Sequence, residues 1–317
     1  MAAESGELRP SDEPGEHAVR AWIELSRPTH WVKNLALCVA PLFGRALGAS
    51  IASGALPWTF ATFCAFASAG YAINDRIDVA ADREHADKRR RPYARGAVHG
   101  RTVIAIALFW IVVGGICLSF AERVADGVLG LALAYVVATV AYSALLKRVF
   151  VLDVLVLAGL FVLRIDAGAR AAGVPVSPWL AVCSVLGACV VGFGKRLAEV
   201  DRNLAVFEPG SVGLTRATLL SYRQSTLKVV VLGLIAALAC VYTAYTVAAG
   251  TTAQFGAGRM PWTLPFALAG LGRYAVTALM RSERIEDPAR LLWTDRWLAG
   301  CAIGWSAVAA WAVSGGG

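Results

Sequence analysis

The chain is poor in charged residues. Asp, Glu, Lys and Arg together make up 16% of its 317 residues, whereas about a quarter of a soluble protein is charged. Hydrophobic residues reach 57% and the mean hydropathy is +0.60, against roughly 45–50% apolar residues in soluble domains. This composition indicates that lipid is the main solvent of the chain. The formal net charge of +8 is then typical of basic cytosolic loops, and no nucleic-acid partner is expected.

Histidines and paired cysteines are also scarce. The seven cysteines all lie in apolar stretches without a CxxC pair, and there are only four histidines, which argues against a zinc site or a disulfide framework. Residues 1–20 are polar and acidic and lack the apolar core of a signal peptide. We expect them to form a disordered cytosolic tail, followed by one transmembrane catalytic domain over residues 21–317.

Long apolar runs dominate the remainder of the chain. Crossing a bilayer takes about 20 mostly apolar residues, and such spans are helices because lipid offers no hydrogen-bond partners to the backbone. The sequence therefore predicts an all-α, polytopic membrane protein with about nine transmembrane helices. The predicted spans are 31–50, 56–73, 102–121, 124–146, 151–171, 177–194, 227–249, 262–280 and 297–314. The first is the weakest, since Pro41, Gly44 and Arg45 interrupt it.

The basic residues gather in alternate loops. With nine spans and a cytosolic N-terminus, all but five of the 30 basic residues fall in cytosolic segments, as the positive-inside rule requires. The five exceptions are Arg45, Arg123, Arg164, Arg170 and Arg259. The two long polar loops, about 74–101 and 195–226, share this face, so the active site is expected on the cytosolic side of the cell membrane.

An acidic motif at the end of the second span carries the strongest chemical signal. In YAINDRIDVAADREHADKRRRPYARG, four oxygen-bearing side chains recur at spacings of three and four, which places them on one helix face; they are Asn74, Asp75, Asp78 and Asp82. Mg²⁺ favours such oxygens and leaves positions open for phosphate. The basic run that follows, with Lys88 and Arg91, would neutralise the rest of a diphosphate. A merely solvated helix end is the alternative, but acids at this depth are costly and usually functional.

Three weaker polar groupings accompany the motif. GKRLAEV holds Lys195, Arg196 and Glu199, which could contact substrate or form an ordinary helical ion pair. RPTHWVKN opens the first span, where Lys33 and Asn34 could bind an anion or anchor the helix at the interface. Arg164 lies inside the fifth span, where a charge faces a cavity or a partner.

Taken together, NDxxDxxxD after an apolar span and about nine predicted helices resemble the UbiA superfamily of intramembrane prenyltransferases, over nearly the whole chain from Arg27 onward. The acidic motif fixes only the superfamily. Further segments make the chain most similar to the decaprenyl-phosphate phosphoribosyltransferases within it: WVKN with its apolar tail, GVPVSPWL, GKRLAEV and GLGRY. The resemblance implies a UbiA-type helical bundle with a cytosolic-facing active site.

The same resemblance implies a reaction. Members of that subfamily transfer 5-phosphoribose from phosphoribosyl diphosphate to decaprenyl phosphate, release diphosphate, and supply decaprenyl-phosphoryl-arabinose for cell-wall arabinan. By this likeness Asp75, Asp78 and Asp82 are catalytic and, with Asn74, hold Mg²⁺. The remaining implied substrate contacts are Lys33, Asn34, Lys88, Arg91, Tyr142, Lys147, Arg164, Lys195, Arg196, Glu199 and Tyr222.

Two other functions stay open at this point. A UbiA-type enzyme that prenylates an aromatic acceptor normally has a second aspartate-rich motif, and the basic Lys195 and Arg196 speak against it. A membrane transporter would carry its acids through the bilayer and often shows internal repeats, whereas here the acids gather at one face. Asp166, Arg170 and Tyr93 depart from the subfamily pattern. Homo-oligomerisation is left open.

Overall fold

The computed structural model describes residues 14–84, 88–149, 151–206, 223–256, 258–286, 291–292 and 294–314, and all regular structure in these ranges is helical. The first half contains α1 (Pro14–Ser26), η1 (Pro28–Cys38), α2 (Val39–Phe43), α3 (Leu47–Ala52), α4 (Ala55–Ile77), α5 (Val79–Glu84), η2 (Lys88–Arg90), α6 (Gly100–Val124), α7 (Val128–Ala144), η3 (Leu146–Arg148) and α8 (Leu152–Ala171). The second half contains α9 (Pro178–Val206), α10 (Gln224–Val247), α11 (Ala249–Phe255), η5 (Met260–Thr263), α12 (Leu264–Met280), η6 (Ser282–Glu286) and α14 (Arg296–Ser314).

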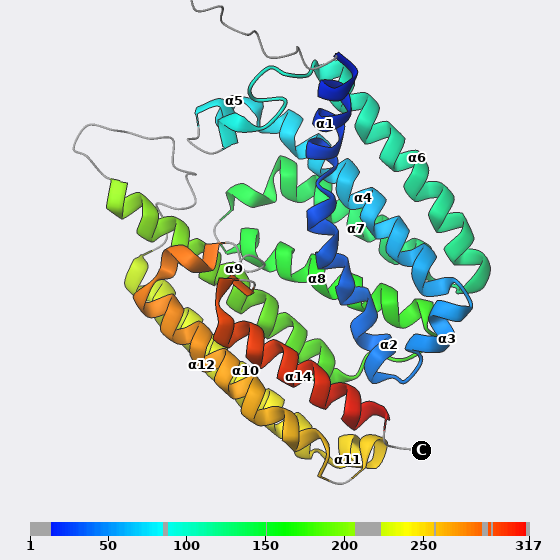
Figure 1. Ribbon diagram of the computed structural model, residues 1–317, viewed down its shortest axis with the longest axis vertical. Coiled ribbons are helices and arrows are strands. Elements are labelled where there is room, and N and C mark those ends of the chain that lie inside the picture. Colours follow the sequence, from blue (N-terminus) through cyan, green and yellow to red (C-terminus); the bar gives the residue numbers. More distant parts are fainter. Residues whose placement is uncertain are drawn as a thin grey trace, which may run out of the picture.

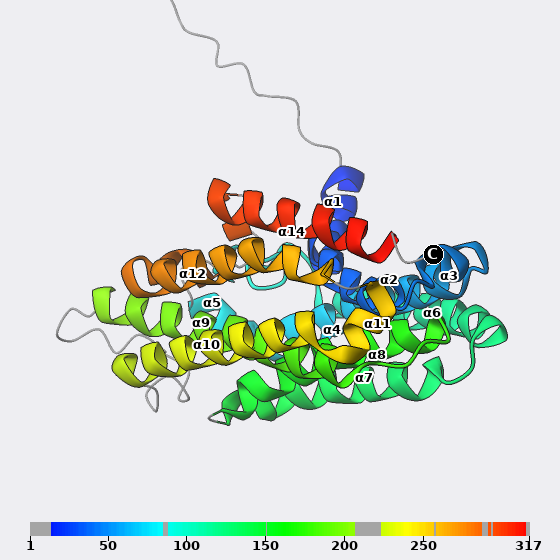
Figure 2. The same cartoon turned by 90° about the horizontal axis from the view of Figure 1, so that it is seen from below.

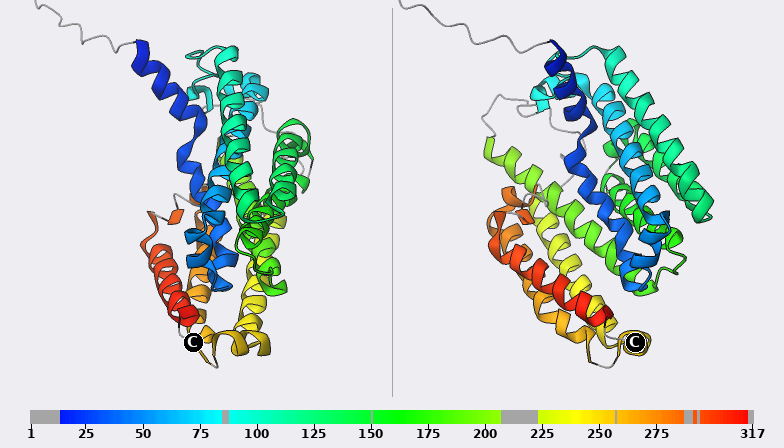
Figure 3. Two further views of the ribbon diagram at one scale, coloured as in Figure 1. Left: turned by 90° about the vertical axis from the view of Figure 1, so that its right-hand side faces the viewer. Right: turned by 45° about the vertical axis from the view of Figure 1, so that its right-hand side comes forward.

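The helices form two groups that meet along α8 and α9 (Figure 1). In the first group α4 packs against α6, α7 and α8, and η1 lies against α4 and α8. In the second, α9 packs on α10, and α12 on α14. Views from below and from the side show the long helices running side by side, with α1 projecting from one end of the bundle (Figures 2 and 3). That end also carries α5 and the C-terminal end of α9 (Figure 1).

Six helices in the described part of the chain are long and apolar enough to cross a membrane, so the predicted count of nine is not confirmed. They are Ala55–Ile77, Gly100–Val124, Pro178–Arg202, Gln224–Val247, Met260–Met280 and Arg296–Ser314. At 17 residues, α7 is about 25 Å long, shorter than the roughly 30 Å hydrocarbon core. The chain is a helical membrane protein by these features.

The predicted span over residues 31–50 is not one continuous helix. The segment overlaps an 11-residue 3-10 helix, η1, and two short α-helices, α2 and α3. Gly44 ends α2, and Arg45 adopts a left-handed backbone with φ of 57°. This break cannot lie inside a continuous helix, because a non-glycine residue at positive φ interrupts the helical hydrogen bonding.

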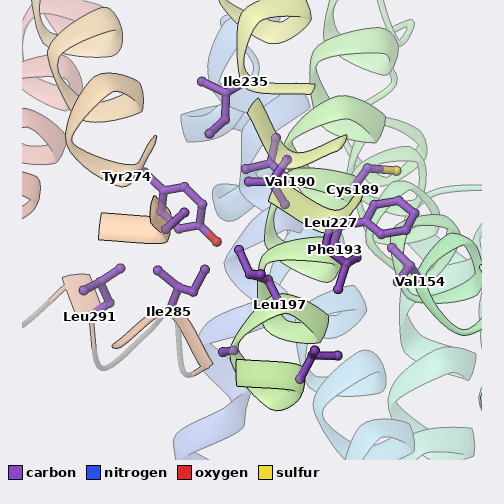
Figure 4. Packing of buried hydrophobic residues seen from close by; sticks show 14 of the residues in the cluster. Val154, Cys189, Val190, Phe193, Leu197, Leu227, Ile235, Tyr274, Ile285 and Leu291 are labelled. Carbon is purple, nitrogen blue, oxygen red and sulfur yellow. The ribbon is translucent and has the colours of Figure 1, made fainter. Parts of the chain in front are cut away.

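Apolar side chains hold each group together. The largest cluster of the described residues joins α8, α9, α10, α12 and η6, and its members include Val190 and Phe193 of α9, Leu227 of α10 and Tyr274 of α12 (Figure 4). In the first group the close approach of η1 to α8 depends on Gly168, because a Cβ there would lie 1.8 Å from the Leu37 carbonyl oxygen. This contact fixes where η1 sits on α8, and so which side chains of the two elements meet.

Candidate functional site

The predicted acidic motif spans a bend between two helices. The α-helix α4 ends at Ile77, Asp78 is its C-cap, and α5 begins at once with Val79. The bend folds the chain back, so that Asp75 and Asp82 are both buried, at 3% and 4% exposure. Two buried carboxylates this close to a helix end require positive partners, because uncompensated charge is costly away from water.

Arg91 bridges the two buried carboxylates. Its Nη1 lies 3.1 Å from Asp75 Oδ1 and 2.6 Å from Asp82 Oδ2. Arg27, from the junction of α1 and η1, also donates to Asp75 Oδ1. Arg91 was predicted to grip phosphate; in the described structure it neutralises the acids that were predicted to hold metal.

A second cation serves the other two motif residues. Lys147 in η3 donates to Asn74 Oδ1 over 3.3 Å and forms an ion pair with Asp78. The lysine side chain is only 5% exposed. The structure thus brings Lys147, a substrate contact implied by the family resemblance, directly to the acidic motif. We refer below to Asn74, Asp75, Asp78, Asp82 and their three cationic partners as the aspartate cluster.

The cluster suits a magnesium ion held together with a phosphate substrate. Its oxygens converge in pairs on two positively charged positions, one at Lys147 Nζ and one at Arg91 Nη1. Within the described residues no three His, Cys, Asp or Glu side chains come together as a complete metal cage. Mg²⁺ commonly takes only one or two carboxylates and fills its octahedron with water and phosphate oxygens, so the donor set fits that mode of binding.

Arg27 is a member of the cluster that sequence reasoning missed. Its backbone is left-handed, with φ of 48°, a conformation that costs a non-glycine residue of order 1 kcal/mol and tends to occur at functional sites. Its guanidinium lies 5.2 Å from the Tyr71 ring centroid. A positive residue directly before Pro28 was the available signal, but its partner lies 48 residues away.

The second predicted constellation is a buried ion pair. Arg196 is 1% exposed, its Nε lies 2.9 Å from Asp153 Oδ2, and it also pairs with Glu199. Asp153, which is fully buried at the start of α8, was not predicted. Through this ion pair Arg196 links α9 to α8. Lys195, the residue before it on α9, is half-buried.

The other predicted residues are spread over the same end and the interior. Lys33 is exposed, Lys88 is half-buried in η2, and Tyr142 is half-buried on the last turn of α7. Asn34 and Arg164 meet inside the first group, where Arg164 Nε donates to Asn34 Oδ1 over 2.7 Å. Tyr222 lies outside the described residues.

A large cavity opens in the second group. Its volume is about 950 Å³, and apolar side chains of α2, α9, α10, α11, α12 and α14 line it. Ligand pockets usually measure about 300–1,000 Å³. A few polar groups converge on its wall, where Tyr242 hydrogen-bonds Thr263 and Trp305 over 2.7 Å each. The cavity reaches Val191 on α9, one turn from Lys195.

Comparison with known proteins identifies the family. The UbiA prenyltransferase family matches residues 35–294, most of the chain and all four motif residues. The chain belongs to the UbiA prenyltransferase family. Among solved structures, a UbiA homologue from Archaeoglobus fulgidus bound to DMAPP and Mg²⁺ superposes with a TM-score of 0.65 at 16% identity, over 93% of this chain and 99% of that one. This likeness shows the UbiA fold.

Two curated relatives are nearer in sequence. Nodulation protein NoeC of Azorhizobium caulinodans is 36% identical over 57% of this chain and 58% of its own. A decaprenyl-phosphate phosphoribosyltransferase of Mycolicibacterium smegmatis is 34% identical over 62% of each chain. The matched region therefore spans about three fifths of the curated relatives it resembles.

Proposed function

We propose that this UbiA-family chain is a transferase that moves 5-phosphoribose from phosphoribosyl diphosphate to a polyprenyl phosphate such as decaprenyl phosphate, with release of diphosphate. The observation that carries the proposal is the aspartate cluster, in which buried acids and three cations alternate at one end of the bundle. Relatives named for this reaction and a fold shared with a Mg²⁺-bound homologue support it.

The acidic and the basic residues of the cluster would have different roles. Bound Mg²⁺ would neutralise the donor's diphosphate and make it a better leaving group. Asp75, Asp78 and Asp82 would supply carboxylate oxygens to that ion, and Asn74 would supply an amide oxygen. Arg27, Arg91 and Lys147 would bind the diphosphate oxygens, where charge builds as the bond to the leaving group breaks.

No strong base is needed for the acceptor. A phosphate monoester oxygen is already anionic at neutral pH, so it attacks the anomeric carbon of ribose as the carbon–diphosphate bond breaks. The bond electrons leave with diphosphate, and no proton has to be removed first. This agrees with the site, where the cluster's carboxylates are all paired with cations.

The apolar cavity of about 950 Å³ would take part of the polyprenyl chain, because its lining offers the lipid the same apolar surroundings as the bilayer. We place the cluster, and with it the reaction, at the cytosolic face of the cell membrane, where the basic residues gather. In that setting the lipid product would supply decaprenyl-phosphoryl-arabinose for cell-wall arabinan.

The test is product formation by purified protein in detergent with Mg²⁺, phosphoribosyl diphosphate and decaprenyl phosphate, measured by mass spectrometry. We expect decaprenyl-phosphoryl-phosphoribose from the wild type, and its loss with EDTA or in Asp78→Asn. Asp126→Asn, at an exposed residue between α6 and α7, is the matched control and should keep activity. Absence of this product, with prenylation of an aromatic acceptor from a prenyl diphosphate instead, would refute the proposal.

A further inference from the structure

Arg164 is a positive charge buried within the first helix group. It lies on α8, 12 residues after Leu152 and hence about 18 Å along the helix from its start. The residue is 7% exposed. Nε donates to Asn34 Oδ1 over 2.7 Å, Nη1 to the Leu160 carbonyl over 2.8 Å, and Nη2 to the Tyr135 hydroxyl over 2.7 Å.

None of these acceptors carries a negative charge. Within the described residues Arg164 forms no ion pair, in contrast to the buried Arg196, which has two acidic partners. Asp166 does not supply one, since a residue two positions along a helix faces another way. The Tyr135 ring, whose centroid lies 4.7 Å from Arg164 Cζ, stabilises the cation without neutralising it.

A buried cation without a counter-charge is costly, by several kcal/mol even after relaxation. Charges of this kind inside a membrane protein usually serve a substrate or an ion pathway. Arginine also has five N–H donors in a planar fork, of which the described contacts use three. The two remaining donors, one on each terminal nitrogen, match the oxygens of a phosphate group.

The position of Arg164 connects it with the aspartate cluster. The ring of Tyr71 lies 5.2 Å from the guanidinium carbon of Arg27, and Arg27 holds Asp75. Tyr71 is also one helical turn before Asp75 on α4. Arg164 lies about 18 Å along α8 from the end that follows Lys147, so an anion at Arg164 would lie deeper in the bundle than the cluster.

We infer that Arg164, held by Asn34 and Tyr135, is a receptor for a phosphate monoester group, separate from the aspartate cluster that takes the diphosphate. The inference rests on the proposed function for its two sources of this group, the 5-phosphate of the sugar donor and the phosphate of the lipid acceptor. In either case Arg164 selects for a substrate pair that carries a monophosphate in addition to the diphosphate leaving group. An ordinary prenyl-transfer reaction does not require this second phosphate group.

Direct binding to the purified full-length protein tests the inference without turnover. The probes are ribose 5-phosphate against ribose, and farnesyl phosphate against farnesol, measured by calorimetry or tryptophan fluorescence. We expect Arg164→Gln to lower the binding affinity for one of the two phosphate probes roughly ten- to a hundredfold, the loss expected for a hydrogen bond to a charged group. Weaker binding of ribose 5-phosphate identifies the sugar donor as the source of the phosphate. Weaker binding of farnesyl phosphate identifies the lipid acceptor.

A second variant guards against misfolding of the first. Asn34→Asp is nearly isosteric, so the variant should keep the fold. It places a carboxylate beside Arg164 Nε. This carboxylate should compete with phosphate for the guanidinium and lower the affinity for the same probe. Arg170→Gln, exposed on the same helix, is the control and should bind as wild type does. Unchanged affinity for both phosphate probes in the Arg164 and Asn34 variants, or no binding to wild type, overturns the inference. Failure of the proposed function would be seen separately, as absence of the transfer product.

Discussion

The ion pair between Arg196 and Asp153 offers the sharpest test of how the two helix groups are joined. The two side chains are 2% and 0% exposed, with Nε and Oδ2 2.9 Å apart. Glu199 also pairs with Arg196 but is 20% exposed, so water screens it more than Asp153. We therefore expect the pair, and not substrate contact, to be the main role of Arg196.

The expected energies follow from this burial. Removing one partner of a buried pair typically costs about 3–5 kcal/mol, because the other charge is left uncompensated. Asp153→Leu should lie near the lower end, since Arg196 keeps Glu199, and Arg196→Met near the upper end. The double variant replaces both charges with apolar groups, an exchange that is often neutral. It should regain most of the lost stability, giving a coupling energy above about 2 kcal/mol.

The assay is a double-mutant cycle of unfolding free energies, with circular dichroism following denaturation in mixed micelles, together with transferase activity. The exposed pair Arg20–Glu24 is the control, and its coupling should be no more than about 0.5 kcal/mol. If Arg196 is structural, the double variant regains activity along with stability. A double variant that is as stable as wild type but inactive would refute this reasoning and restore Arg196 as a substrate contact.

Three further predictions concern single contacts. Gly168→Ala should separate η1 from α8, since its Cβ would lie 1.8 Å from the Leu37 carbonyl oxygen. We expect a lower unfolding temperature and weaker substrate binding. Gly159→Ala, with open space around it, is the control and should change neither the unfolding temperature nor substrate binding. Asp295 caps α14 through the N–H groups of Trp297 and Leu298, and its hydrogen bond to Arg273 holds the pKa of Asp295 below its ordinary value. The stabilisation by the Asp295 carboxylate is thus complete above the unfolded-state pKa and is lost as pH falls through the lower folded-state pKa. Asp295→Ala should lower the free energy of unfolding by about 1 kcal/mol near neutrality and should abolish this acid-dependent step in unfolding titrations. Arg27→Gln should weaken the affinity for phosphoribosyl diphosphate roughly tenfold or more, measured as KM, and an unchanged KM would remove Arg27 from the site.

Local patterns gave good predictions where neighbours in the sequence are also neighbours in space. Asn74, Asp75, Asp78 and Asp82 were found from their spacing alone, and the structure places them at one helix bend. Lys147 was predicted only weakly, although it contacts two of them. The reason is distance along the chain, since 69 residues separate Lys147 from Asp78 and no helical periodicity connects them.

The features that the sequence did not predict have the same origin. Residues 31–50 have the composition of a membrane helix, but the 3-10 helix η1 and the left-handed turn at Arg45 divide the segment, the turn lying where the sequence already shows an interruption. Arg196 has the spacing of an ordinary helical pair with Glu199, and its stronger partner, Asp153, comes from another helix. Pairing across helices depends on packing, which a one-dimensional pattern does not contain.

The sequence by itself determined the helical membrane character, the family and the acidic motif, because apolar content, helix period and charge asymmetry are properties of short segments. Only the tertiary structure decided which cations neutralise those acids, that Arg196 is bound to Asp153, and that Arg164 is buried among neutral partners. These outcomes depend on how η1, α4, α7, α8 and α9 pack, since burial sets the energetic cost of each charge and therefore selects its partner.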